Sequence, residues 1–180
     1  MSWSGWIPVG QSEIIEFSLG NSGRGEVIIE SVEITGEISE ITSIEGKPDI
    51  VEPGENKTLK IEIFGDVNIS DLVKEMSGNI RIITDEGLYQ PLISLNVTFI
   101  ENLIQKVDSL MRELSELDKN ITVLEKFTDV SYLKNESKLI KDNLNEVKNL
   151  YNQGDYERSV PIFRSVKSDV ENLKEDVFLT

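Results

Sequence analysis

Residues 92–124 have the sequence LISLNVTFIENLIQKVDSLMRELSELDKNITVL. Apolar and polar residues alternate in it up to Phe99, and this period of two is typical of a half-buried β-strand. Beyond Phe99 the apolar residues are spaced alternately three and four apart as far as Leu124, which predicts a helix with an a/d heptad seam. We therefore expect an α+β protein in two segregated parts, an all-β part over residues 1–99 and a helical bundle over residues 100–180.

The two patterns meet without a turn-rich segment between them. Thr98 and Glu101 have the spacing of a capping box, in which a threonine caps the helix and a glutamate three residues later reaches back to it. This spacing predicts a first helix that begins at about residue 99. We expect the last strand to feed directly into it through a stiff join over residues 97–101.

Short alternating segments separated by turn residues make up the first part of the chain. Residues 15–19, 59–63 and 93–99 each place apolar side chains on one face and polar side chains on the other. Residues 21–23 (Asn-Ser-Gly) and 53–55 (Pro-Gly-Glu) are turn sequences. Six to eight strands at a spacing of roughly 8–12 residues predict an immunoglobulin-like sandwich, although the Cys…Trp…Cys signature of antibody domains is absent.

Apolar spacing in the second part predicts an antiparallel, coiled-coil-like bundle that runs up-down-up. Gly154 suits the left-handed position after a helix, and Asp155 suits the N-cap of the next one. Pro161 predicts that the third helix either starts near Ser159 or bends there. The three helices are expected over about residues 99–127, 130–152 and 156–178.

The seam of the first helix has two interpretations. Ile104 and Met111 widen its apolar stripe, which favours burial against more than one helix of the same chain. A long a/d seam is also what dimeric coiled coils use, so a homo-oligomer or a protein partner bound through the helical region remains an alternative. The seam residues, which are the candidate oligomer contact, are Leu103, Val107, Leu110, Leu114, Leu117, Ile121 and Leu124.

The residue types present exclude several classes of function. The 180 residues contain no histidine and no cysteine, which excludes Ser-His-Asp and Cys-His catalysis and zinc-thiolate sites. We therefore expect no enzyme, no catalytic residue, no cofactor and no metal site. The net charge is −15, and residues 1–99 hold 17 acidic and 6 basic residues, a net charge of −11. Such a surface repels phosphate backbones, so we expect no binding to nucleic acid.

Asn-X-Ser/Thr triplets occur more often than the composition predicts. With 13 Asn and 26 Ser and Thr among 180 residues, chance gives about two triplets of the glycosylation acceptor pattern. The excess predicts glycan acceptors on an extracellular surface, and the alternative is an accident of a surface rich in Asn and Ser. The candidate acceptors are Asn56, Asn68, Asn96, Asn120 and Asn135.

The first part resembles the immunoglobulin-like modules of cell-surface proteins from archaea and some bacteria. The resemblance rests on residues 17–23, which end in an Asn-Ser-Gly turn, and on residues 51–63, where Pro-Gly-Glu precedes a strand. It is completed by residues 77–87, where a glycine opens a strand that ends in Thr-Asp-Glu-Gly. The resemblance implies a spacer, an adhesive unit or a sensory ectodomain without an active site, followed in many cases by a coiled coil that leads to a membrane anchor.

We therefore expect a non-enzymatic extracellular module of a membrane-anchored surface protein, which serves binding, adhesion, sensing or spacing. Residues 173–179 stay largely apolar, so we expect the third helix to continue beyond Thr180 towards a transmembrane segment. The membrane would be reached only through that anchor, outside this chain. The alternative is a soluble, cytoplasmic scaffold or chaperone-like assembly subunit that uses the helical part for protein contacts.

Overall fold

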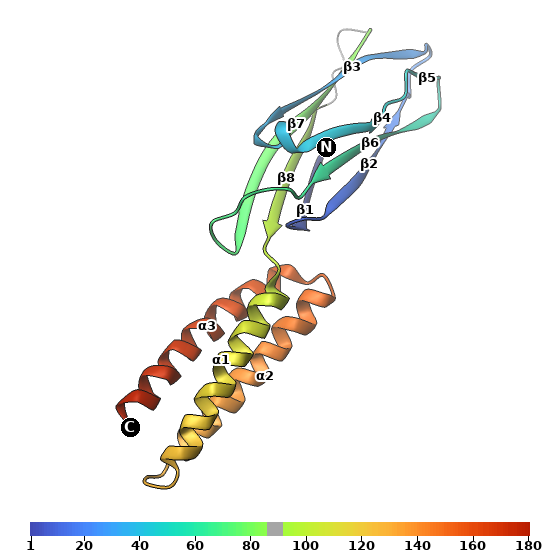
Figure 1. The fold of residues 1–180 in the computed structure, drawn as a ribbon. Helices are drawn as coiled ribbons and strands as arrows, with labels where there is room; N and C mark the ends of the chain where they lie inside the picture. The colour runs from blue at the N-terminus through green and yellow to red at the C-terminus, as the bar shows by residue number, and fades with distance from the viewer. Residues whose placement is uncertain (86–91) are drawn as a thin grey trace. The chain divides into compact units, whose positions relative to one another are not determined.

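The computed structural model describes residues 1–85 and 92–180 of the chain (Figure 1). It divides into two compact units, Met1–Glu101 and Asn102–Thr180. The first unit is built from strands and the second from helices, so the protein belongs to the α+β class. The end of the predicted Thr-Asp-Glu-Gly motif, at residues 86–87, lies outside the described residues.

The first unit contains two sheets. One has the strand order β1-β8-β7-β3-β5 and the other has the order β2-β6-β4. A short 3-10 helix, η1 (Glu37–Ile41), connects β3 to β4. The strands within the described residues are β1 (Ser2–Pro8), β2 (Ser12–Gly20), β3 (Val27–Gly36), β4 (Thr42–Gly46), β5 (Ile50–Val51), β6 (Asn56–Phe64), β7 (Val73–Thr84) and β8 (Leu92–Ile100).

The order of these strands is that of an immunoglobulin-like sandwich. Such sandwiches pair strands B, E and D in one sheet and C, F and G in the other. The sheet β2-β6-β4 corresponds to B-E-D, and the run β3-β7-β8 corresponds to C-F-G. The first strand, β1, is instead paired in parallel with β8 at the edge of the larger sheet. The prediction of an immunoglobulin-like sandwich is therefore confirmed at the level of strand order.

The alternating residues seen in the sequence meet in one core between the sheets. Ile15 and Phe17 of β2 pair with Ile61 and Leu59 of β6, and all four side chains are buried. The opposite sheet contributes a matching apolar face from β1, β3, β7 and β8 to the same cluster. The period of two in the sequence thus identified the faces that the two sheets turn towards each other.

Two glycines bring β3 and β7 unusually close at one end of the larger sheet. Gly36, with φ +89°, pairs with Gly78, and a Cβ on Gly36 would lie 2.7 Å from the Gly78 Cα. A Cβ on Gly78 would lie 2.2 Å from the Thr35 carbonyl oxygen and 2.3 Å from Ile38. Ile38 of η1 is fully buried, so the missing side chain at residue 78 makes room for η1 to cover the core.

The second unit contains α1 (Leu103–Leu124), α2 (Ser131–Asn152) and α3 (Tyr156–Leu179). Each helix buries one apolar stripe, and the three stripes pack on one another (Figure 1). The α1–α2 connection and the α2–α3 connection are both short, so that sequential helices run antiparallel.

The predicted capping box at the strand–helix junction is wrong. Thr98 lies inside β8, where it pairs with Trp6 of β1 and with Glu75 of β7. Pairing on both sides keeps β8 extended as far as Ile100, and α1 therefore begins four residues later than the predicted residue 99. Asn102 is the cap instead, because its Oδ1 accepts from the backbone N–H groups of residues 104 and 105 at 3.1 and 3.4 Å.

The other helix boundaries follow the sequence closely. Gly154, two residues after the end of α2, has φ +78°, and the side chain of Asp155 accepts from the backbone N–H of Arg158 at the start of α3, so both predictions are confirmed. Pro161 lies inside α3, which begins at Tyr156 rather than near Ser159. The first helix ends at Leu124, three residues before the predicted end.

Candidate glycosylation and contact sites

The asparagines of all five acceptor triplets are exposed to solvent. They lie in different backbone settings, which range from the interior of helices to an irregular segment. Asn120 belongs to α1 and Asn135 to α2, whereas Asn96 lies within β8 and Asn56 is the first residue of β6. Asn68 lies in the connection between β6 and β7, which has no regular secondary structure over residues 65–69.

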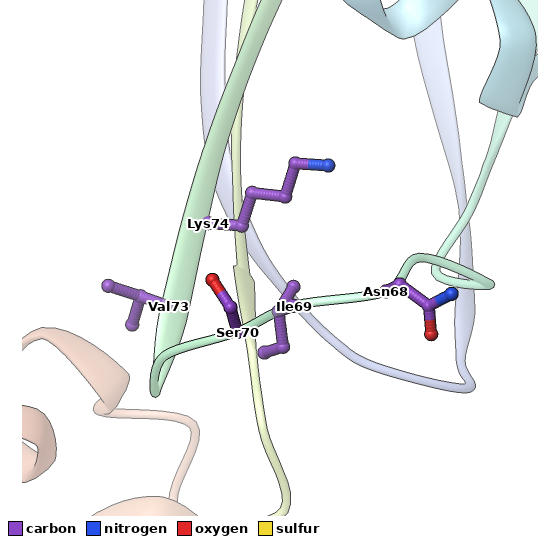
Figure 2. Close-up of a pocket in the computed structure, with 5 residues that line it drawn as sticks. All are labelled: Asn68, Ile69, Ser70, Val73 and Lys74. Atoms are coloured by element: carbon purple, nitrogen blue, oxygen red, sulfur yellow. The ribbon is translucent and has the colours of Figure 1, made fainter.

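The Asn68 triplet borders a shallow, open pocket (Figure 2). Asn68, Ile69 and Ser70 form one wall of the pocket, and Val73 and Lys74 at the start of β7 form the other. Asn68 and Ser70 are exposed, and Ile69 is half-buried. Within residues 1–85 and 92–180, no group of three or more carboxylates, histidines or cysteines is arranged to hold a metal ion.

The seam of the first helix forms the core of the helical unit. Leu103, Val107, Leu114, Leu117 and Ile121 are all buried against α2 and α3 within the same chain. Leu110 and Leu124 are half-buried. Because these side chains are already covered, they offer little surface to a second chain, and the oligomer contact through the seam stays a prediction.

A polar contact is built into the α1–α2 interface. Ser137, which occupies a seam position of α2, is 2% exposed and donates from its hydroxyl to Asp118 Oδ1 at 2.6 Å. Lys141 forms an ion pair with Oδ2 of the same carboxylate. The sequence pattern showed Ser137 as an interruption of the seam, but its partner is on another helix and carries no sequence signal of its own.

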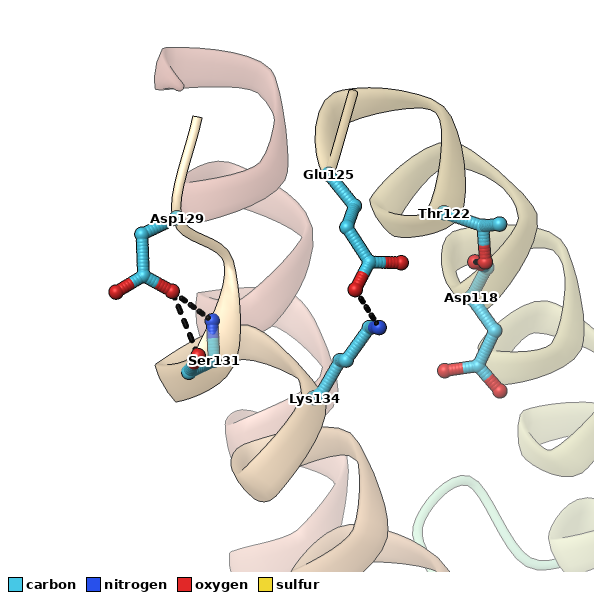
Figure 3. A network of polar contacts seen from close by, with 6 residues as sticks. All are labelled: Asp118, Thr122, Glu125, Asp129, Ser131 and Lys134. Carbon is cyan, nitrogen blue, oxygen red and sulfur yellow. Dashed lines mark hydrogen bonds and ion pairs between the residues drawn. The ribbon is translucent and has the colours of Figure 1, made fainter. Parts of the chain in front are cut away.

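Further ion pairs join the helices around this contact. Lys134 of α2 forms an ion pair with Glu125, which follows α1 (Figure 3). In the connection between the two helices, Asp129 Oδ1 accepts from the Ser131 N–H at 2.9 Å. The Ser131 hydroxyl also donates to Asp129 Oδ1, at 2.6 Å, and these two hydrogen bonds hold the pKa of the Asp129 carboxyl below its ordinary value. Ion pairs of this kind select the antiparallel alignment of α2 against α1 more than they stabilise it, since exposed pairs contribute little.

Glu136 of α2 is influenced by the negative charges of two aspartates on α3. Desolvation raises the pKa of Glu136, and the negative charges of Asp176 and Asp169 raise it further. Between α1 and α3 a carboxylate is instead paired with an opposite charge, because Lys174 Nζ lies 2.8 Å from Glu113 Oε1. Desolvation and the like charges thus both disfavour the ionised form of Glu136 at the α2–α3 contact.

One end of the helical unit carries exposed apolar side chains. Phe127 in the α1–α2 connection is 82% exposed, and Phe178 and Leu179 in the last turn of α3 are 73% and 86% exposed. A hydrogen-bonding contact of 3.2 Å between the Tyr132 hydroxyl and Thr180 Oγ1 places the start of α2 beside the end of α3. We call the exposed side chains of Val123, Phe127, Phe178 and Leu179 the apolar end cluster.

None of the described helices is long and apolar enough to cross a membrane. No family model and no curated protein matches the chain.

Several solved structures are similar to part of the chain. The secreted serine protease VesC from Vibrio cholerae has a TM-score of 0.38 and 12% identity over 56% of this chain and 21% of its own. A protein of unknown function from Porphyromonas gingivalis W83 has a TM-score of 0.41 and 17% identity over 54% of this chain and 43% of its own.

A chain of the CsuC–CsuE chaperone–tip adhesion subunit pre-assembly complex, from the archaic chaperone-usher Csu pili of Acinetobacter baumannii, has a TM-score of 0.36 and 14% identity. That similarity covers 55% of this chain and 54% of its own, so this chain spans less than two thirds of each of the three proteins. At these scores the similarities assign no activity to this chain.

Proposed function

We propose that the chain is a non-enzymatic extracellular module of a membrane-anchored surface protein. In this proposal the immunoglobulin-like unit serves binding, adhesion or spacing, and the helices form a coiled-coil-like bundle that leads to the membrane anchor. The absence of histidine and cysteine, and of any nucleophile or phosphate-loop motif in the sequence, supports a role without catalysis.

The observation that carries the proposal is the exposure of the asparagines of the five acceptor triplets. Each of the five asparagines is exposed, so a glycan on any of them would point into solvent and displace no core residue. The strongly acidic surface is consistent with a solvated exterior position.

The apolar end cluster supports a position of that end near a membrane. Phe127, Phe178 and Leu179 expose aromatic and aliphatic surface in the α1–α2 connection and in the last turn of α3. Exposed surface of this kind is costly in water and is better placed at an interface. The membrane anchor itself would lie outside this chain.

Localisation of the native protein tests the proposal. An antibody against this chain should label intact cells of the source organism, and the protein should sediment with membranes and be released by detergent but not by concentrated salt. A protein that stays in the soluble fraction of lysed cells and is labelled only after permeabilisation would overturn the proposal.

The exposed cluster also favours a second candidate function. A soluble scaffold or chaperone-like assembly subunit would use Phe127 and Phe178 to bind an apolar surface of another protein. Crosslinking in lysates separates the two candidates: a soluble complex that is lost in the double substitution F127S and F178S supports the scaffold, and recovery with membranes supports the ectodomain.

A further inference from the structure

The five acceptor triplets differ in how far the fold leaves them available to an enzyme. Glycan transfer joins the asparagine Nδ2 to the anomeric carbon of a sugar carried on a lipid phosphate. The bond between that carbon and the phosphate oxygen breaks, the lipid phosphate leaves, and Nδ2 gives up one proton. The transferase must bind both the asparagine and the hydroxyl of the residue two positions later. The whole triplet therefore has to give up its contacts with the rest of the folded chain.

The two helical triplets are engaged by the bundle. Between Asn120 and Thr122 lies Ile121, which is 1% exposed, and the Thr122 hydroxyl donates to the Asp118 carbonyl oxygen at 2.8 Å. In the second triplet the hydroxyl belongs to Ser137, which is buried and donates to Asp118 Oδ1. An enzyme could reach either triplet only after local unfolding of the helix.

The two strand triplets are held by sheet pairing. Asn96 and Thr98 flank the buried Val97 in β8, which is paired with β1 on one side and β7 on the other. The triplet at Asn56 is paired on one side only, where Asn56 is in register with Gly20 of β2. Asn56 is therefore the nearest competitor, and Asn96 is much less available.

The remaining triplet lies in a segment that is fixed at its ends and open in the middle. Gly65 exchanges backbone hydrogen bonds with Gly10 and Gln11 at 2.9 and 2.7 Å, and the Leu72 carbonyl accepts from the Glu101 N–H at 2.9 Å. Between these anchors Asn68 and Ser70 are exposed, outside any strand or helix, and they line the open pocket (Figure 2). Ile69 between them is half-buried and packs against the sandwich core. This triplet can enter an enzyme's active site by giving up the contact of Ile69 with the core, without the loss of any strand pairing or helical turn.

We infer that Asn68 is the principal glycan acceptor of the folded chain. The inference rests on the proposed function, since a glycan reaches the native protein only in a compartment that holds the transferase. It goes beyond that function by assigning one acceptor among five on structural grounds, with a lipid-phosphate-linked oligosaccharide as the donor.

The test uses the folded 180-residue chain, a purified oligosaccharyltransferase and a lipid-linked oligosaccharide, with occupancy at each asparagine measured by glycopeptide mass spectrometry. We expect Asn68 to be modified on the order of tenfold faster than Asn120 or Asn135, because those two must first unfold locally. Five unfolded peptides, each spanning one triplet, measure how readily the enzyme accepts each sequence without the fold. Among these peptides the faster modification of Asn68 should disappear.

Matched variants complete the test. N68Q should lose the glycan that forms first, and so should S70A, which keeps the asparagine and removes the acceptor hydroxyl. N120Q should leave the early product unchanged. Equal or faster modification of Asn56, Asn96, Asn120 or Asn135 in the folded chain would overturn the inference, as would a folded chain that accepts no glycan.

These outcomes are separate from the fate of the proposed function. A native protein found in the cytoplasm and free of glycan would contradict the extracellular role even if the purified chain were modified at Asn68. A native surface protein with its glycan on Asn120 would contradict the choice of Asn68 and leave the extracellular role intact.

Discussion

The sandwich unit and the helical unit fix the alignment of their elements by different means. Strands exchange backbone hydrogen bonds with their neighbours, so the register of β3 against β7 is set by the backbone and by the close approach of Gly36 and Gly78. A helix satisfies its backbone internally, so only side chains can align α2 against α1. Asp118, Ser137 and the surrounding lysine pairs do this. We therefore expect the stability of the sandwich to depend on the space left between its backbones, and the stability of the bundle to depend on the side chains between its helices.

The largest effect is expected from L144A. Leu144 is fully buried in the bundle, and its truncation should cost about 3 kcal/mol of the free energy of unfolding of the helical unit. Urea unfolding followed by circular dichroism at 222 nm measures it. L139A removes the same atoms from a position on the same helix that is 61% exposed, and it should change stability by less than about 0.5 kcal/mol.

The next effect is expected from G78A in the sandwich. The added Cβ would lie 2.2 Å from the Thr35 carbonyl oxygen and would push against the buried Ile38, so we expect a loss of about 2 kcal/mol. The fluorescence of Trp3 and Trp6, both in β1, reports the unfolding of this unit. G25A adds the same atom where nothing lies within 4 Å, and a loss of stability equal to that of G78A would show that space at residue 78 is not the cause.

A smaller effect is expected from N102A. Its side chain accepts the first N–H groups of α1, so its removal should destabilise the helical unit by about 1 kcal/mol. N149A, at an exposed position inside α2, should have no such cost. If T98A lowered the helical transition as much as N102A does, the cap would have been assigned to the wrong residue.

The smallest effect is expected from E136Q and depends on pH. The pKa of Glu136 is raised in the folded protein, so its ionised form weakens the α2–α3 contact above that pKa. E136Q should therefore raise the urea midpoint of the helical unit at neutral pH, and the gain should vanish below the ordinary pKa of 4.5. E146Q, at an exposed position of α2, is the control. A gain that persisted at low pH would have another origin than the desolvation and charge repulsion of the ionised Glu136 carboxylate.

The sequence predicted the features that depend on local periodicity. The change of period near Phe99, the turn at Gly154 and the cap at Asp155 are all encoded by neighbouring residues. The cap at Thr98 was predicted wrongly, because the pairing of β8 with β1 and β7 overrides the local motif.

Contacts between distant residues were beyond the sequence pattern. Gly36 and Gly78 lie on different strands, and Asp118 meets Ser137 only once α1 and α2 are folded together. The choice among the five acceptor triplets has the same character. All five triplets match one sequence pattern. Among the described residues, the asparagines of the other four triplets belong to a strand or a helix, whereas Asn68 lies outside both.

Paired unfolding curves test most directly the claim that the sandwich unit and the helical unit are each stabilised by different interactions. Tryptophan fluorescence and circular dichroism at 222 nm should be recorded on the same urea series for the unsubstituted chain, L144A and G78A. We expect L144A to move only the circular dichroism transition of the helices and G78A to move the fluorescence transition of the sandwich. A single transition in which both variants shift both signals equally would contradict the account.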